Sequence, residues 1–275
     1  MKKQTVFWTL WLVCLLLTPA KAARIDTLAV HSPSMNRAID MVVIAPDQSL
    51  GNEPVRCPVI YLLHGFGNNH FSWMKIKPNL PQIADRDGLI FVCPNGQDSW
   101  YWDSPQRPDY RYETFISQEM IAYVDSHYAT IADRTGRAIT GLSMGGQGAM
   151  WNAIRHKEVF GAAGSTSGGV DIRPFPKSWN MSKSLGDKET HPEVWEQHAV
   201  INLVEQLQNH DLALIIDCGE KDFFLEVNKA FHQKLLEHGI DHDFITRPGM
   251  HNWDYWNNSI DYQILFFEKF FGKIP

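Results

Sequence analysis

The stretch Ala138-Ile139-Thr140-Gly141-Leu142-Ser143-Met144-Gly145-Gly146-Gln147-Gly148-Ala149 decides the fold of this chain. A strand-like run leads into Ser143, and a run of small residues that can begin a helix follows directly. The pattern Gly-x-Ser-x-Gly is that of a nucleophile elbow, in which a serine occupies a strained turn between a strand and a helix. Gly141 and Gly145 leave room for such a turn because neither carries a side chain. An incidental serine in a glycine-rich turn would have the same pattern, so the rest of the chain must decide.

Residues 1–22 predict a secretory signal peptide. Two lysines form a basic start, residues 6–17 are almost wholly apolar, and a small-x-small pattern ends at Ala22. The apolar run of about a dozen residues is short for a membrane-spanning helix, which needs roughly 20. The alternative is an uncleaved N-terminal anchor. We expect cleavage after Ala22, a periplasmic or secreted mature chain, and no stable membrane insertion after cleavage.

Composition favours a single globular domain over residues 23–275. The formal net charge is −6, and removal of the three lysines within residues 1–22 would change it to −9. A net negative charge disfavours nucleic acid or an anionic membrane surface as a partner. Three cysteines remain (Cys57, Cys93 and Cys218), and each ends an apolar run, so we interpret them as core residues. No cluster of histidines and cysteines indicates a metal site, and we expect no cofactor.

Apolar runs typical of buried strands alternate with segments of helical periodicity. This alternation predicts an α/β fold with a mainly parallel sheet and helices on both faces. Residues 25–31 and 38–45 precede it and predict an antiparallel hairpin. Residues 168–207 form a long insertion, in which a helical stretch is expected from Pro192. The other expected strands are residues 58–63, 89–93, 138–142, 160–165, 212–218 and 243–246, and the expected helices are 80–85, 113–127, 144–156, 224–238 and 255–271.

Candidate partners for Ser143 follow later strands. A serine hydroxyl needs a histidine base and a carboxylate that orients it, and in the α/β-hydrolase arrangement the chain order is serine, acid, histidine. His251 lies in a Pro-Gly-Met-His loop directly after the last strand, where it can reach the same sheet edge. Asp222 is the favoured acid because its loop can turn the carboxylate toward that edge. Glu220, on the turn, is the second choice. Asp217 also competes, but it still lies within the strand run, where we interpret its side chain as a structural hydrogen-bonding group.

Acyl transfer also needs two backbone N–H donors for the developing oxyanion. Met144, directly after the serine, supplies one. Phe66 is the best candidate for the other, because the turn His64-Gly65 lets the backbone approach the substrate. We expect the side chain of His64 to shape this loop by hydrogen bonding, since it precedes the serine in a glycine turn.

Several segments resemble the esterase D-like branch of the α/β-hydrolases. That branch includes carbohydrate esterase family 1 feruloyl and acetylxylan esterases, S-formylglutathione hydrolases and the antigen 85 mycolyltransferases. The resemblance implies the α/β-hydrolase fold, Ser143, Asp222 and His251 as the catalytic triad, and the amides of Phe66 and Met144 as the oxyanion hole. The loop Phe66-Gly67-Asn68-Asn69 departs from the family's pattern. The matching segments are residues 31–37, 62–65, 112–115, 141–146, 217–223 and 248–256.

We therefore expect an exported serine esterase that removes feruloyl or acetyl groups from plant cell-wall polysaccharide. Ten tryptophans are many for this length, and aromatic rings can stack on a sugar or a phenolic acid. Trp100, Tyr101 and Trp102 on one loop, and Trp179 in the insertion, are the candidate substrate-binding residues. The alternatives are an acyltransferase of the antigen 85 type, an S-formylglutathione hydrolase-like thioesterase and a non-catalytic carbohydrate-binding protein.

Overall fold

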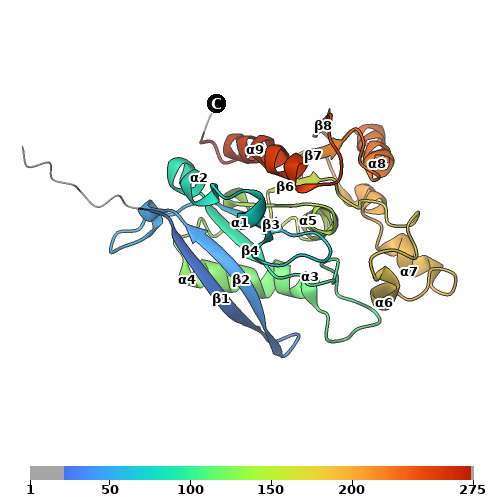
Figure 1. Ribbon diagram of the computed structural model, residues 1–275, viewed down its shortest axis with the longest axis horizontal. Helices are drawn as coiled ribbons and strands as arrows, with labels where there is room; N and C mark the ends of the chain where they lie inside the picture. Colours follow the sequence, from blue (N-terminus) through green and yellow to red (C-terminus); the bar gives the residue numbers. More distant parts are fainter. Residues whose placement is uncertain (1–21, 274–275) are drawn as a thin grey trace, which may run out of the picture.

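The computed structural model describes residues 22–273, so the expected signal peptide lies outside the described residues except for Ala22. One eight-stranded sheet runs through the molecule in the order β1-β2-β4-β3-β5-β6-β7-β8 (Figure 1). The hairpin β1-β2 and the pair β2-β4 are antiparallel, and all later pairs are parallel. The strands are β1 (Arg24–Ser32), β2 (Arg37–Ala45), β3 (Val59–Leu63), β4 (Ile90–Pro94), β5 (Arg137–Gly141), β6 (Ala162–Thr166), β7 (Ala213–Gly219) and β8 (Asp243–Arg247).

Helices cover both faces of the sheet. On one face α4, α5 and α8 pack against the strands, and on the other face α1, α2 and α9 do so. The α/β-hydrolase fold expected from the sequence is confirmed. The helices are α1 (Ser72–Ile76), α2 (Leu80–Asp87), α3 (Tyr112–Thr114), α4 (Met120–His127), α5 (Met144–Arg155), α6 (Met181–Leu185), α7 (Pro192–Gln197), α8 (Leu225–Glu237) and α9 (Trp253–Phe270).

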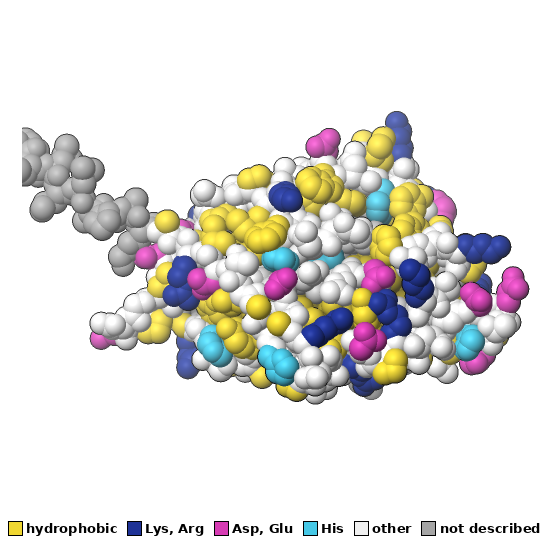
Figure 2. Space-filling model, turned by 60° about the horizontal axis from the view of Figure 1, so that its bottom comes forward, with side chains coloured by type: hydrophobic (Ala, Val, Ile, Leu, Met, Phe, Trp, Pro, Cys, Tyr) yellow, Lys and Arg dark blue, Asp and Glu magenta, His cyan; other side chains and the backbone are white. Residues whose placement is uncertain are grey.

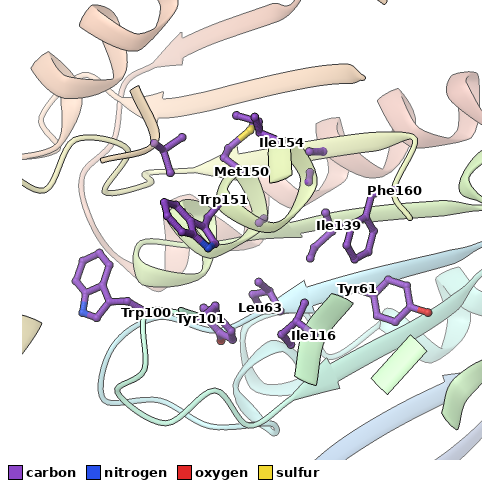
Figure 3. Packing of buried hydrophobic residues seen from close by; sticks show 14 of the residues in the cluster. Tyr61, Leu63, Trp100, Tyr101, Ile116, Ile139, Met150, Trp151, Ile154 and Phe160 are labelled. Atoms are coloured by element: carbon purple, nitrogen blue, oxygen red, sulfur yellow. The ribbon is translucent and has the colours of Figure 1, made fainter. Parts of the chain in front are cut away.

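The central strand β3 shows why its residues form an uninterrupted apolar run. Tyr61 and Leu63 point into the core beneath α5, whereas Ile60 and Leu62 point into the core beneath α9. Successive side chains of a strand alternate between faces, so a strand covered on both sides needs apolar residues at every position. Figure 3 shows Tyr61 and Leu63 with Trp151 of α5 in the first of these cores.

Some helices differ from the expected ones, and α1 was not expected. The helix expected at residues 113–127 is present, but a π-helical turn at Phe115–Glu119 separates α3 from α4. The insertion contains α6, which helical periodicity does not reveal because the helix spans only five residues. Figure 1 shows α6 and α7 at the end of the molecule nearest α8. The insertion therefore lies beyond the parallel half of the sheet.

Three features of the described residues bear on the expectations drawn from composition: the cysteines, the lengths of the helices and the charges on the surface. Cys57, Cys93 and Cys218 are buried and unpaired, as expected of core residues. Within residues 22–273 there is no helix long and apolar enough to cross a membrane. On the face shown in Figure 2, basic and acidic side chains are interspersed among apolar ones rather than gathered into patches of one sign.

Candidate active site

Ser143 lies in the strained turn that its sequence pattern predicts. It joins β5 to α5 with φ 56° and ψ −116°, a conformation that side-chain-bearing residues rarely adopt. A Cβ added to Gly145 would lie 2.2 Å from the carbonyl oxygen of Leu63, and one added to Gly141 would lie 2.5 Å from the backbone of Gly145. Both glycines are therefore required by close backbone packing, and the turn lifts the serine hydroxyl above the sheet edge.

His251 reaches Ser143 from the loop between β8 and α9. Its Nε2 atom lies 2.9 Å from Ser143 Oγ. The rings of Phe223 and Trp256 pack against the imidazole, with centroids 4.3 and 4.9 Å away. Because these rings contact the imidazole, packing as well as hydrogen bonding helps to hold its orientation toward the hydroxyl.

Asp222 holds the other nitrogen of this imidazole. The Nδ1 atom of His251 lies 2.9 Å from Asp222 Oδ2 and 3.1 Å from Oδ1. A carboxylate accepts hydrogen bonds, so Nδ1 carries the proton and Nε2 is left to accept from the hydroxyl of Ser143. The backbone N–H of Phe224 donates to Asp222 Oδ1 over 2.8 Å. Hydroxyl, imidazole and carboxylate thus form one hydrogen-bonded chain in the order that the sequence predicts.

The competing acids lie elsewhere. Asp217 is buried within β7, where it accepts hydrogen bonds from Tyr255 Oη and the Arg247 guanidinium. Glu220 is exposed on the turn. Neither carboxylate contacts His251, so Asp222 is the acid that the tertiary structure brings to the histidine. Asp217 instead links β7 to the first turn of α9.

The two expected oxyanion donors also lie at Ser143. A Cβ added to Gly65 would lie 3.4 Å from Ser143 Cβ, so the loop after β3 packs directly on the elbow. Among the hydrogen bonds of the described residues, neither the N–H of Phe66 nor that of Met144 has a protein acceptor. Two backbone amides without a protein acceptor beside one serine are what an oxyanion-binding site requires.

A small cavity of about 280 Å³ opens above the serine. Trp179, the candidate substrate-binding residue of the insertion, forms part of its wall. Phe223 and Trp256 were not predicted to line it, and only their positions beside Asp222 and His251 could have indicated this. The lining residues are Gly65, Phe66, Asn68, Ser143, Trp179, Phe223, His251 and Trp256.

The expectation for the aromatic loop requires correction. Trp100, Tyr101 and Trp102 are buried, with side chains no more than 1% exposed, and they do not line the cavity. Trp100 Nε1 donates to the carbonyl of Trp179, and Tyr101 Oη donates to that of His64. These rings are therefore structural, because apolar burial and hydrogen bonds to the cavity-forming loops hold them inside the protein.

The arrangement has the parts that acyl transfer through a serine needs. A hydroxyl lies within hydrogen-bond distance of an imidazole, and a carboxylate orients that imidazole through its second nitrogen. Among residues 22–273 no group of three or more histidine, cysteine or acidic side chains is arranged to hold a metal ion.

Comparison with known proteins agrees with this geometry. The Esterase family model matches residues 32–267. A protein named acetyl esterase from Caldicellulosiruptor saccharolyticus is 26% identical, with 73% of this chain and 79% of that protein covered. The diacylglycerol acyltransferase/mycolyltransferase Ag85B of Mycolicibacterium smegmatis is also 26% identical, with 90% and 86% covered.

Comparison with a solved structure also points to an esterase. A ferulic acid esterase superimposes with a TM-score of 0.78 at 28% sequence identity, covering 90% of this chain and 98% of that chain. Because the family model spans most of the chain and the fold is shared, the chain belongs to the Esterase family of α/β-hydrolase-fold proteins and is an esterase-family hydrolase.

Proposed function

We propose that this protein is an exported serine esterase that removes feruloyl or acetyl groups from plant cell-wall polysaccharide. The observation that carries the proposal is the hydrogen-bonded chain from Asp222 through His251 to Ser143. Relatives named acetyl esterase and ferulic acid esterase support the acyl groups. The apolar run at residues 6–17 supports export.

The first half of the proposed reaction forms an acyl-enzyme. Ser143 Oγ attacks the ester carbonyl carbon while His251 Nε2 takes the hydroxyl proton, and Asp222 stabilises the resulting imidazolium. The carbonyl oxygen becomes an oxyanion that the N–H groups of Phe66 and Met144 bind. When the intermediate collapses, the bond to the sugar oxygen breaks and His251 gives its proton to the leaving alcohol.

The second half repeats these steps with water. His251 removes a proton from a water molecule, which attacks the acyl carbon and forms a second oxyanion in the same site. Collapse releases the carboxylic acid and returns the proton to Ser143 Oγ. The protons balance over this cycle, since each proton that His251 removes is given back within the same half-reaction.

The cavity supports a planar aromatic or a short acyl group. Its walls include Trp179 and Phe223, whose rings are nearly parallel at 20° with centroids 5.7 Å apart. Aromatic walls favour a phenolic acid through stacking and apolar burial.

A panel of acyl esters assayed with wild type and Ser143→Ala tests the proposal. Methyl ferulate, p-nitrophenyl acetate and a feruloylated arabinoxylan fragment are the substrates, with S-formylglutathione as the thioester comparison. We expect the wild type to hydrolyse the oxygen esters and the variant to lose at least 1,000-fold in kcat, on the order seen when a triad member is removed. Acid release by Ser143→Ala at the wild-type rate would overturn the mechanism.

Acyl transfer to a sugar is the second candidate, because the similarity to the Ag85B acyltransferase covers 90% of this chain. The two reactions share every step up to the acyl-enzyme and differ only in whether water or a sugar hydroxyl attacks it. Adding glucose or trehalose to the ester assay separates them. A transferase would form a sugar ester and release little free acid without the acceptor.

A further inference from the structure

His64, the first residue after β3, holds two loops together inside the protein. Its side chain is 1% exposed. The Nε2 atom lies 2.8 Å from the backbone nitrogen of Gly96, on the loop after β4, and the N–H donates to it. A nitrogen that accepts a hydrogen bond carries no proton, so the proton of this neutral imidazole is on Nδ1.

The proton on His64 Nδ1 is donated to the backbone carbonyl of the next residue. His64 Nδ1 lies 2.8 Å from the carbonyl oxygen of Gly65 and donates to it. The N–H of Asn68 donates to the same oxygen over 3.2 Å. Burial lowers the pKa of His64 to about 4, so the ring stays neutral and keeps this tautomer at neutral pH. Both ring nitrogens are engaged, so His64 is not free to act as a base.

The carbonyl of Gly65 and the N–H of Phe66 belong to one peptide group. A peptide group is planar, and in the trans form its C=O and N–H point in opposite directions. Fixing the direction of the Gly65 carbonyl therefore fixes the direction of the Phe66 N–H. That N–H has no protein acceptor among the described residues, and the preceding Gly65 packs against Ser143.

We propose that His64 is a positioning residue that holds the Gly65–Phe66 peptide group so that the Phe66 N–H faces the oxyanion. This proposal rests on the proposed function, in which that amide is an oxyanion donor. His64 touches no substrate atom and transfers no proton. Its backbone is held as well, because Tyr101 Oη donates to the His64 carbonyl over 3.0 Å. The buried loop that carries Tyr101 thus helps to hold the backbone next to the Gly65–Phe66 peptide group in place.

Two substitutions separate the two hydrogen bonds of the ring. In His64→Asn the amide nitrogen can take the place of Nδ1 and donate to Gly65, but the side chain is too short to accept from Gly96. In His64→Gln the amide oxygen can take the place of Nε2 and accept from Gly96, but no side-chain donor remains for Gly65. His156→Gln is the matched control, since this partly buried histidine ends α5 at the opposite end from Ser143.

We expect His64→Gln to lower kcat by 10- to 100-fold with KM changed less than threefold. An oxyanion exists only in the transition state, so losing its donor lowers kcat and leaves ground-state binding unchanged. His64→Asn should keep kcat within about fivefold of wild type, and His156→Gln should keep it unchanged. The second readout is the inhibition constant of an aryl trifluoromethyl ketone, which forms an oxyanion on a serine. It should rise in His64→Gln by the factor by which kcat falls.

Two results would overturn the positioning role of His64 and leave the proposed function standing. One is a His64→Gln variant as active as the wild type. The other is an equal loss of kcat in both His64 variants with unchanged inhibition by the ketone. The second would mean that His64 acts only through folding. A wild type without Ser143-dependent hydrolysis would overturn the proposed function, and this proposal with it. The Ser143→Ala comparison therefore distinguishes failure of the positioning role from failure of the mechanism.

Discussion

The backbone N–H of Lys221 donates to the carbonyl of Gly249 over 2.8 Å and ties the loop after β7 to the loop after β8. A second bond, from the Glu220 N–H to the Arg247 carbonyl, runs beside it over 2.9 Å. The first loop carries Asp222 and the second carries His251. Their carboxylate–imidazole contact is therefore set by backbone bonds between the loops and does not depend on two independently mobile segments.

This tie gives a specific expectation for Asp222. In Asp222→Asn the loop geometry is retained, but the amide can donate to Nδ1 and so favours the wrong tautomer of His251. We expect kcat to fall by roughly 10⁴-fold, as for the corresponding change in a serine protease triad. Steady-state kinetics on p-nitrophenyl acetate measures it. Glu220→Gln is the control, and a larger loss there than in Asp222→Asn would show that the wrong carboxylate has been assigned.

The elbow predicts a stability effect at Gly145. A Cβ in Gly145→Ala would lie 2.2 Å from the Leu63 carbonyl oxygen, so β3 and α5 must move apart. We expect a loss of more than about 3 kcal/mol in the free energy of unfolding or a failure to fold, as for overpacking of backbone against backbone. Urea unfolding measures the loss.

Gly67→Ala is the steric control for that variant. Gly67 has φ 76° but no atom within 4 Å of an added Cβ. It should therefore cost only the 1–2 kcal/mol typical of a left-handed conformation with a side chain. Equal losses at the two glycines would contradict the packing argument for the elbow.

Glu113 is expected to make a pH-dependent contribution to the free energy of unfolding. Burial acts to raise the pKa of its carboxyl, but hydrogen bonds from His156, Arg155 and Trp151 outweigh burial and lower the pKa to about 2. A folded-state pKa below the usual 4.5 means that the stabilisation is complete above pH 4.5 and is lost as the pH falls toward 2. Glu113→Gln should thus destabilise the protein by about 3 kcal/mol at pH 6.

Denaturant unfolding at pH 6 and pH 3.5 checks this. The difference between wild type and Glu113→Gln should shrink at the lower pH. At pH 3.5 the Glu113 carboxyl is largely protonated in the unfolded chain but still ionised in the folded protein, so the proton taken up on unfolding lowers the stability of the wild type. Glu158→Gln is the control, since the Glu158 side chain is 72% exposed at 3.4 Å from the same histidine and should contribute little. A gap between wild type and Glu113→Gln that widens on acidification would contradict the prediction.

Replacing Trp179 is expected to change the preference between feruloyl and acetyl esters. In Trp179→Ala the cavity loses an aromatic wall that a feruloyl ring can contact and an acetyl group cannot fill. We expect kcat/KM for methyl ferulate to fall at least tenfold, which is about 1.4 kcal/mol, while that for p-nitrophenyl acetate changes less than threefold. Phe175→Leu is the control, because Phe175 packs against Trp179 and Phe224 without lining the cavity. Equal losses on both esters would argue against an aromatic acyl site.

Much of the site could be predicted because its signals are local. The glycines around Ser143 specify a turn by their own backbone conformation, and the apolar runs specify strands by side-chain alternation. Parallel strands place their carboxyl ends at one edge, so the order of Ser143, Asp222 and His251 along the chain already predicts that they meet. The structure brings these three residues into hydrogen-bond contact.

What the sequence by itself determined, then, is the α/β fold, the elbow and the order of the reactive side chains. Only the tertiary structure decided which rings face the cavity. Trp100 and Trp179 are 79 residues apart, yet the hydrogen bond from Trp100 Nε1 to the Trp179 carbonyl joins their loops, with the first ring buried and the second on the cavity wall. Local patterns report which residues are apolar, but contacts between distant loops decide whether an aromatic ring packs inside the protein or meets a substrate.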